Sequence, residues 1–368
     1  MTRTRRTALR WLAPVLAAVV LIGAGGAVSA LTNAARADLP PRSASTLLVD
    51  IQKARLTGLS GTIVQHADLG IPALPTSGGT GSSTSPASLV SGSHTLRVWY
   101  AGPERSRISL LGDYGESDLV KNGRSVWLWS SADKTATHWV LPAGTRHEPS
   151  TQLPMNRMTP QRAADAALKA ISPSTKVTTN GTAEVAGRSA YLLALAPRSA
   201  NTLVESVQVA IDGKTHVPTR VQVFAKGHTA PVFEVGFTSF DPHSPSSSVF
   251  GFNPPPGTKV TRKSLDSLAP DRSGRRAVQA AVPGSAPHVV GSGWSSVLVV
   301  PAPKQAKALT SSGKGLAAMV SKLPKVSGSW GSGRLLRGTV FSALLTDNGT
   351  LVVGAVPPKT LYAALGAR

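Results

Sequence analysis

The stretch LVKNGRSVWLWSS, from Leu119 to Ser131, predicts a β-hairpin. Asn122-Gly123 is a strong signal for a two-residue turn, because both residue types tolerate a positive φ. A strand is therefore expected to follow it. Similar turn signals recur at Asn180-Gly181, Asp212-Gly213 and Asp347-Asn348-Gly349.

The strand after this turn has two apolar faces. Side chains alternate along a strand, so Val126 and Leu128 point one way while Trp127 and Trp129 point the other. An ordinary half-exposed strand has one polar face. The second apolar face either packs against another sheet layer or lines a hollow enclosed by a curved sheet, and the periodicity leaves both alternatives open.

The surrounding sequence predicts a mainly β domain over residues 42–257, a large antiparallel meander with two inserted helices. One helix begins at Ser43 or Ser45 and ends by Gly58, and the other runs from Thr159 to Ile171. Residues 258–293 lack a sustained period and are expected to form a flexible linker. Residues 294–368 predict a small α+β domain.

The net charge of +21 suggests a nucleic-acid partner, but no nucleic-acid-binding motif accompanies it. Nucleic acid is therefore not expected as a partner, whereas an anionic membrane surface would suit the excess of arginine and lysine. The chain contains no cysteine, which excludes disulfides, a thiolate metal site and a cysteine nucleophile.

The N-terminal residues 1–37 resemble an export signal. A basic segment precedes an uncharged, mostly apolar run from Trp11 to Leu31, and small residues follow it. The run is long enough to span a bilayer, at about 20 residues. It is either a signal peptide cleaved after Ala30 or Ala37, or a retained signal anchor. The remaining chain is expected outside the cytoplasm, anchored to the membrane or secreted.

No known catalytic motif occurs, so the sequence predicts neither an enzyme nor a cofactor. Ser311 to Lys314 fits the S-x-x-K pattern without its companion motifs. The eight histidines are dispersed, which predicts no metal site, and His138 is expected to face solvent. The acidic residues Asp113, Glu116 and Asp118 are expected to form a solvated loop.

The order of several motifs resembles the LolA-like superfamily. These motifs are LSGTIVQ, LRVWYAGPERSRISL, LVKNGRSVWLW, HWVLP, VAGRSAYLLALAP, VQVAIDGKTHVPTRVQVF and FGFNPPPGTKV. They are most similar to the actinobacterial RseB/MucB family, which regulates an anti-sigma factor. The resemblance implies an incomplete, strongly curved antiparallel β-barrel with inserted helices and a small C-terminal α+β domain.

The resemblance further implies that the concave side binds lipid or lipoprotein acyl chains. Because indole is a large apolar group with a polar N–H, Trp127 and Trp129 are the expected lining residues, together with Trp99 and Trp139. The alternative is an envelope-stress sensor that binds a membrane-bound anti-sigma factor through residues 294–368.

Overall fold

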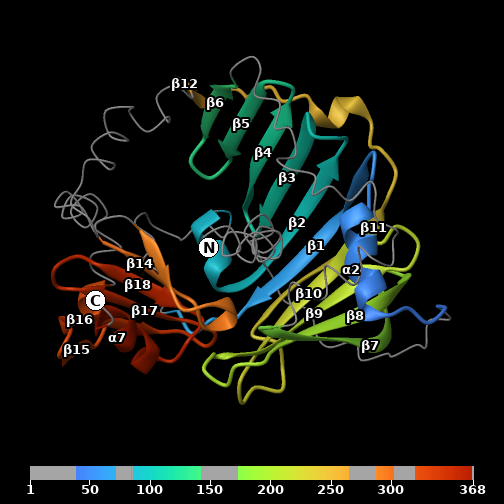
Figure 1. Ribbon diagram of the computed structural model, residues 1–368. Coiled ribbons are helices and arrows are strands. Elements are labelled where there is room, and N and C mark those ends of the chain that lie inside the picture. Colours follow the sequence, from blue (N-terminus) through green and yellow to red (C-terminus); the bar gives the residue numbers. More distant parts are fainter. Residues whose placement is uncertain are drawn as a thin grey trace.

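The computed structural model describes residues 39–71, 84, 86–141, 173–264, 287–301 and 320–366. These residues form a twelve-stranded sheet and a six-stranded sheet, with few helices (Figure 1). The large sheet is curved and does not close on itself, because its edge strands β7 and β12 do not pair with each other. The predicted fold class, a mainly β fold with an incomplete barrel and a small α+β unit, is confirmed.

The large sheet has the strand order β12-β6-β5-β4-β3-β2-β1-β11-β10-β9-β8-β7. Neighbouring strands are antiparallel except β6 and β12, which are parallel. The strands are β1 (Leu59–Ala67), β2 (Gly92–Tyr100), β3 (Arg105–Gly112), β4 (Gly115–Asn122), β5 (Ser125–Ser130), β6 (Thr135–Val140), β7 (Thr175–Val185), β8 (Arg188–Pro197), β9 (Val204–Asp212), β10 (Pro218–Ala225), β11 (Phe233–Asp241) and β12 (Lys259–Ser264).

Helix α2 (Ala44–Lys53) covers one half of the concave face, that of β7–β11. Ser43 caps its N-terminus by accepting a hydrogen bond from the Thr46 N–H at 3.2 Å. The core of the large sheet includes Leu47 of the helix with Ile63 and Leu193 of the strands. Each buried leucine contributes about 1.5–3 kcal/mol. Other members of this core are Leu96, Leu110, Tyr191, Val209, Ile211, Val221, Phe233 and Val235.

The hairpin turns lie close to the predicted positions, with two differences. Asn122 pairs with Ser125, so the turn between β4 and β5 is Gly123-Arg124, with φ +58° at Gly123. Asn180-Gly181 is not a turn: it lies inside β7, where the pairing register shifts. Ala186-Gly187 makes the turn instead, with φ values of +53° and +71°. Paired positive φ values are the signature of a type I′ turn.

The second sheet has the order β13-β14-β18-β17-β16-β15 and packs one face against helix α7 (Pro358–Gly366). Its core includes Val297, Leu335 and Leu361. The strands are β13 (His288–Val290), β14 (Val297–Val300), β15 (Lys325–Gly328), β16 (Gly331–Arg337), β17 (Ser342–Thr346) and β18 (Leu351–Gly354). The short 3₁₀ helices are η1 (Pro86–Val90), η3 (Ser247–Phe250) and η5 (Gly293–Ser295).

The two sheets are joined by hydrogen bonds near the start of β7 and the start of β9. The Trp294 indole N–H donates to Thr175 Oγ1 at 2.8 Å, and Thr202 Oγ1 donates to the Ala355 carbonyl at 2.7 Å. Trp294 and Ala355 also pack against the core of the large sheet. These contacts hold the second sheet against the large sheet. In Figure 1 the second sheet lies below strands β5, β6 and β12.

Several predictions concern residues outside the described ranges. These are the export signal at 1–37, the helix from Thr159 to Ile171, the S-x-x-K match at Ser311 and the middle of the predicted linker. The linker itself was predicted from residue 258, but β12 extends the large sheet to Ser264. Within the described ranges, no helix has both the length and the hydropathy needed to cross a membrane.

Candidate functional site

Strands β2–β6 and β12, here called the arm, bring the quoted hairpin into the large sheet. Residues directly opposite each other on neighbouring strands share a face. Leu119 pairs with Leu128, and Leu119 also pairs with Ile108. Because Ile108 packs against the core that contains helix α2, these three side chains lie on the concave face.

The opposite, convex face of the arm carries Trp127 and Trp129. Trp127 pairs with His138, and their rings stack with centroids 4.1 Å apart. The Phe252 ring lies 5.4 Å from Trp127 and 6.0 Å from Trp129, measured between centroids. Phe252 follows η3, whose Phe250 is only 1% exposed. The segment around η3 is therefore the cover of the convex face.

A buried polar cluster lies beneath this cover. Asp118 is 1% exposed and accepts hydrogen bonds from Arg107 Nη2 at 2.5 Å and from Ser109 Oγ. Arg107 Nη1 also donates to the Val249 carbonyl of η3 at 3.3 Å, and its guanidinium stacks over Trp99. The prediction that Asp118 belongs to a solvated loop is wrong, because its strand position places the carboxylate beside an arginine under η3.

The four tryptophans predicted to line the hollow do not share a face. Trp99, Trp127 and Trp129 lie on the covered convex face, whereas Trp139 pairs with Val126 on the concave face. The indole Nε1 atoms of Trp129 and Trp139 are buried without a hydrogen-bond partner. A role of these residues in binding stays a prediction, and the geometry favours Trp139 alone among them.

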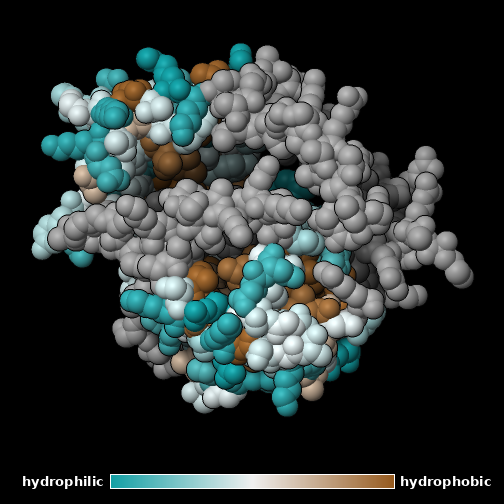
Figure 2. Space-filling model, turned by 90° about the vertical axis from the view of Figure 1, so that its left-hand side faces the viewer, coloured by the Kyte–Doolittle hydropathy of each residue, from teal (hydrophilic) through white to brown (hydrophobic). Residues whose placement is uncertain are grey.

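The concave face of the arm exposes two large apolar side chains that were not among the expected lining residues. Leu119 is 43% exposed and Leu128 is 37% exposed. They are direct cross-strand neighbours and continue the apolar surface of Val98 and Ile108. Figure 2 shows hydrophobic residues beneath the upper strands, at the margin of the hollow. Leu119 was in the quoted stretch, but its neighbours across the sheet could not be identified from periodicity.

The titratable groups of the arm include His138, whose surroundings differ from the prediction. His138 was expected to face solvent, but it is half-buried against Trp127 and accepts or donates a 2.8 Å hydrogen bond with Ser125 Oγ. Burial, and then the positive charge of Arg262, lower the pKa of His138. Among the described residues, no group of three or more His, Asp or Glu side chains could hold a metal ion.

Comparison with solved structures gives similar folds at low sequence identity. The MucA/MucB complex of Pseudomonas aeruginosa is 14% identical with a TM-score of 0.43, covering 88% of this chain and 96% of that chain. MucB alone is 15% identical with a TM-score of 0.39, covering 86% and 94%. A LolA superfamily protein from Nitrosomonas europaea is 11% identical with a TM-score of 0.19, covering 58% and 99%.

No protein-family model and no curated protein matches the sequence. MucB and a LolA superfamily protein, the two kinds that the motif order indicated, are among the solved structures found to be similar. This likeness concerns the fold, so the function has to follow from the residues of this chain.

Proposed function

We propose that this chain is a non-enzymatic protein of the cell envelope whose concave face binds an acyl chain of a lipid or lipoprotein. The observation that carries the proposal is the exposed pair Leu119 and Leu128 on the concave face of the arm. Single exposed leucines are ordinary on protein surfaces. Here the pair continues an apolar surface that begins in the core, so an apolar ligand would extend that core rather than form an isolated contact.

The concave face of the arm has the length that such a ligand needs. Neighbouring strands are about 4.8 Å apart, so the four intervals from β2 to β6 span about 19 Å. An acyl chain in one leaflet is about 15 Å long, half of the hydrocarbon thickness of a bilayer. One chain laid across Val98, Ile108, Leu119 and Leu128 would fit within the arm.

A substitution on this face tests the proposal directly. Leu128→Lys places a charge where the acyl chain would lie. Affinity for a fluorescent fatty acid should fall at least tenfold, because the bound chain would remove the hydration of the lysine ammonium group. Val140→Lys is the matched control, since Val140 is 49% exposed and lies on the convex side of β6. Equal affinities of both variants and the parent protein would refute a concave-face site.

Native mass spectrometry of the protein purified from its host adds an independent test. The proposal requires a population that carries a lipid mass, and lipid extraction should remove it. If the protein is isolated free of lipid and also fails to bind fluorescent fatty acids, acyl-chain binding is excluded as its function.

A second candidate function is binding of a membrane-bound anti-sigma factor through residues 294–368. The second sheet leaves the face opposite α7 apolar: Leu298 and Leu351 are each 40% exposed. Leu298→Asp in the full chain should abolish capture of an anti-sigma factor identified by peptide sequencing. Val260→Asp is the control, because Val260 is 40% exposed but lies on the large sheet. Unchanged capture by the Leu298 variant would exclude this surface.

Both candidates place the protein outside the cytoplasm, as residues 1–37 predict. Sequencing the N-terminus of the protein from its host separates a cleaved signal, which starts after Ala30 or Ala37, from a retained anchor that keeps Trp11 to Leu31. A stable cytoplasmic pool with Met1 intact would contradict export in either form.

A further inference from the structure

The concave face of the arm changes from apolar to polar toward the free edge of the large sheet. A single cross-strand row runs from Leu119 through Leu128 and Thr137 to Thr261. The two leucines are followed by two hydroxyl groups. A ligand lying along this row would therefore meet hydrocarbon first and hydrogen-bonding groups at the sheet edge.

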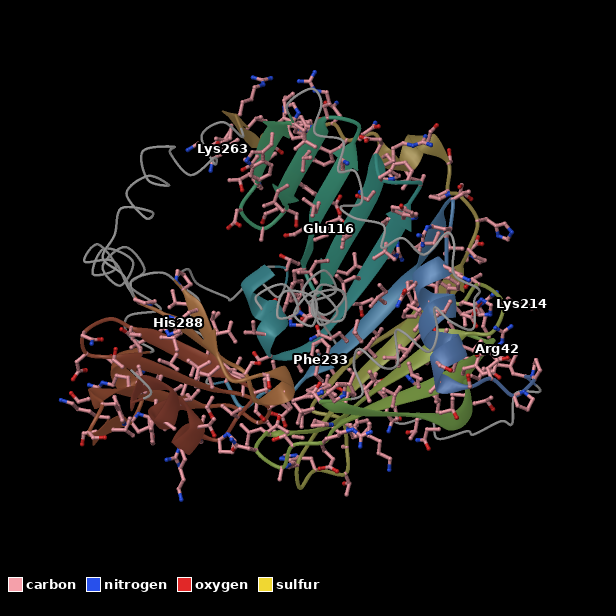
Figure 3. All side chains as sticks on the ribbon, viewed as in Figure 1. Arg42, Glu116, Lys214, Phe233, Lys263 and His288 are labelled. Atoms are coloured by element: carbon pink, nitrogen blue, oxygen red, sulfur yellow. The ribbon has the colours of Figure 1, made fainter. Side chains whose placement is uncertain are left out.

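Two lysines flank the polar end of this row. Lys259 and Lys263 lie two residues to either side of Thr261 on β12, so all three share one face. Both lysines are exposed, and neither has an ion-pair partner in the described part of the chain. Lys121 differs, because Glu104 lies 3.7 Å from its Nζ. Figure 3 shows Lys263 at the free edge of the sheet.

Among the described residues, the strands of this face carry no acidic side chain on it, and the one carboxylate bonded to the face is that of Asp133 in the β5–β6 turn, which accepts a hydrogen bond from Ser130 Oγ. On the concave side of β4, β5, β6 and β12 there is no aspartate or glutamate, while the acidic residues Glu116 and Asp118 of β4 point to the convex side. Asp133 forms no ion pair with either lysine, and cations without an ion-pair partner attract anionic ligands, because the attraction is not cancelled locally. Along this row the side chains therefore become polar toward the sheet edge, and the positive charges lie at the same end.

We propose that the arm binds an anionic phospholipid, with its phosphate held at the β6–β12 edge. This inference rests on the proposed acyl-chain function and adds the headgroup. The acyl chain lies over Leu119 and Leu128, and the phosphate meets the ammonium groups of Lys259 and Lys263. The Thr137 and Thr261 hydroxyls donate to its oxygens. Lysines on an edge strand also prevent strand pairing with other chains, and that role alone predicts no headgroup preference.

Competition binding with the purified full-length chain tests the assignment. The assay measures how strongly each of three competitors displaces a fluorescent acyl probe: dioleoyl phosphatidylglycerol, dioleoyl phosphatidylcholine and oleate. The anionic phospholipid should bind about thirtyfold more tightly than the zwitterionic one, given about 1 kcal/mol for each of the two lysines near the headgroup. The double variant Lys259→Gln/Lys263→Gln should lose this preference and still bind phosphatidylcholine.

Arg262→Gln is the matched control, because Arg262 lies on the same strand but faces His138 on the convex side. It should keep the preference for phosphatidylglycerol. An equal loss in this variant would mean that only net charge matters, and the headgroup site would be refuted. Equal binding of both phospholipids, or preference for oleate alone, would also overturn the inference while leaving acyl-chain binding intact. Failure of all three lipids would refute the proposed function itself.

Discussion

The two faces of β5 carry similarly apolar side chains but have different surroundings. Trp127 and Trp129, on the convex face, contact Phe252 from the segment after η3. Leu128, on the concave face, has no aromatic contact of this kind among the described residues and is 37% exposed. The larger side chains are therefore in the structural interface, and the smaller ones form the candidate binding surface.

This difference teaches that residue size alone does not identify a binding face. A strand with two apolar faces needs two covers, and one of them can be a ligand. Here the protein cover of the convex face comes from the segment of Phe250 and Phe252, more than a hundred residues after β5. Whether a side chain is core or site depends on which distant segment returns to it.

The comparison predicts the largest stability effect at the cover itself. Phe250→Ala should lower the free energy of unfolding by about 3–5 kcal/mol, because Phe250 is 1% exposed and its removal leaves a cavity against the convex face. Urea denaturation measures the change. Tyr114→Ala is the control, since Tyr114 is fully exposed and should tolerate the change. A loss below about 1 kcal/mol in Phe250→Ala would show that η3 is not the cover.

Trp127→Ala should have an intermediate effect. The side chain is half-buried between His138 and Phe252, so about 2 kcal/mol of stability should be lost, roughly half the cost at a fully buried site. Acyl-chain affinity should stay within twofold of the parent protein. Titration with a fluorescent fatty acid checks this. Strongly weakened binding in a well-folded variant would place the tryptophan in the site after all.

Local sequence patterns predicted the two strands of the quoted hairpin and their alternation correctly. The separation of Val126 and Leu128 from Trp127 and Trp129 follows from the two-residue period alone. The period cannot say which face is concave, because that depends on pairing between β3 and β4 and on helix α2. The parallel strand β12 was missed for a related reason: its sequence, KVTRKS, is too short and charged to show an alternating pattern.

Turn prediction is likewise limited by pairing between distant strands. Asn180-Gly181 has the composition of a hairpin turn, but it lies in a bulge of β7, where Gly181 has φ +80°. A bulge also needs a residue that tolerates a positive φ. The sequence therefore identified where the backbone is unusual, and the partner strand β8 decides whether it turns or bulges.

The convex face also carries a buried ion pair on strands β8 and β9, and its contribution to stability depends on pH. Asp212 is 1% exposed and binds Arg188 through Nε at 2.6 Å and Nη2 at 2.9 Å. Burial raises its pKa, but hydrogen bonds from Arg188 and Thr215 outweigh burial and lower the pKa from 3.8 to about 2. A lowered carboxyl pKa stabilises the fold above the unfolded-state pKa, and this contribution is lost as the pH falls.

The fold should therefore lose about 2 kcal/mol as the pH drops from about 4 to about 2. Thermal unfolding across this range measures the loss. In Asp212→Asn the carboxyl is absent, so the variant is less stable at neutral pH and its stability should fall less steeply in acid. The same slope in both proteins would assign the acid sensitivity to other carboxyl groups.

The smallest stability effect should come from a substitution on the concave face of the arm. It distinguishes a binding residue from a core residue most clearly. Leu119→Ser removes a side chain that is 43% exposed, so stability should change by less than about 1 kcal/mol. Acyl-chain affinity should nevertheless fall about tenfold, because two CH₂-sized contacts are worth about 1.6 kcal/mol. Trp127→Ala should show the opposite pattern, reduced stability with retained affinity. Urea denaturation and fatty-acid titration of the two variants measure both quantities. If Leu119→Ser destabilises the fold and leaves affinity unchanged, the concave leucines are core residues and the acyl chain must bind elsewhere.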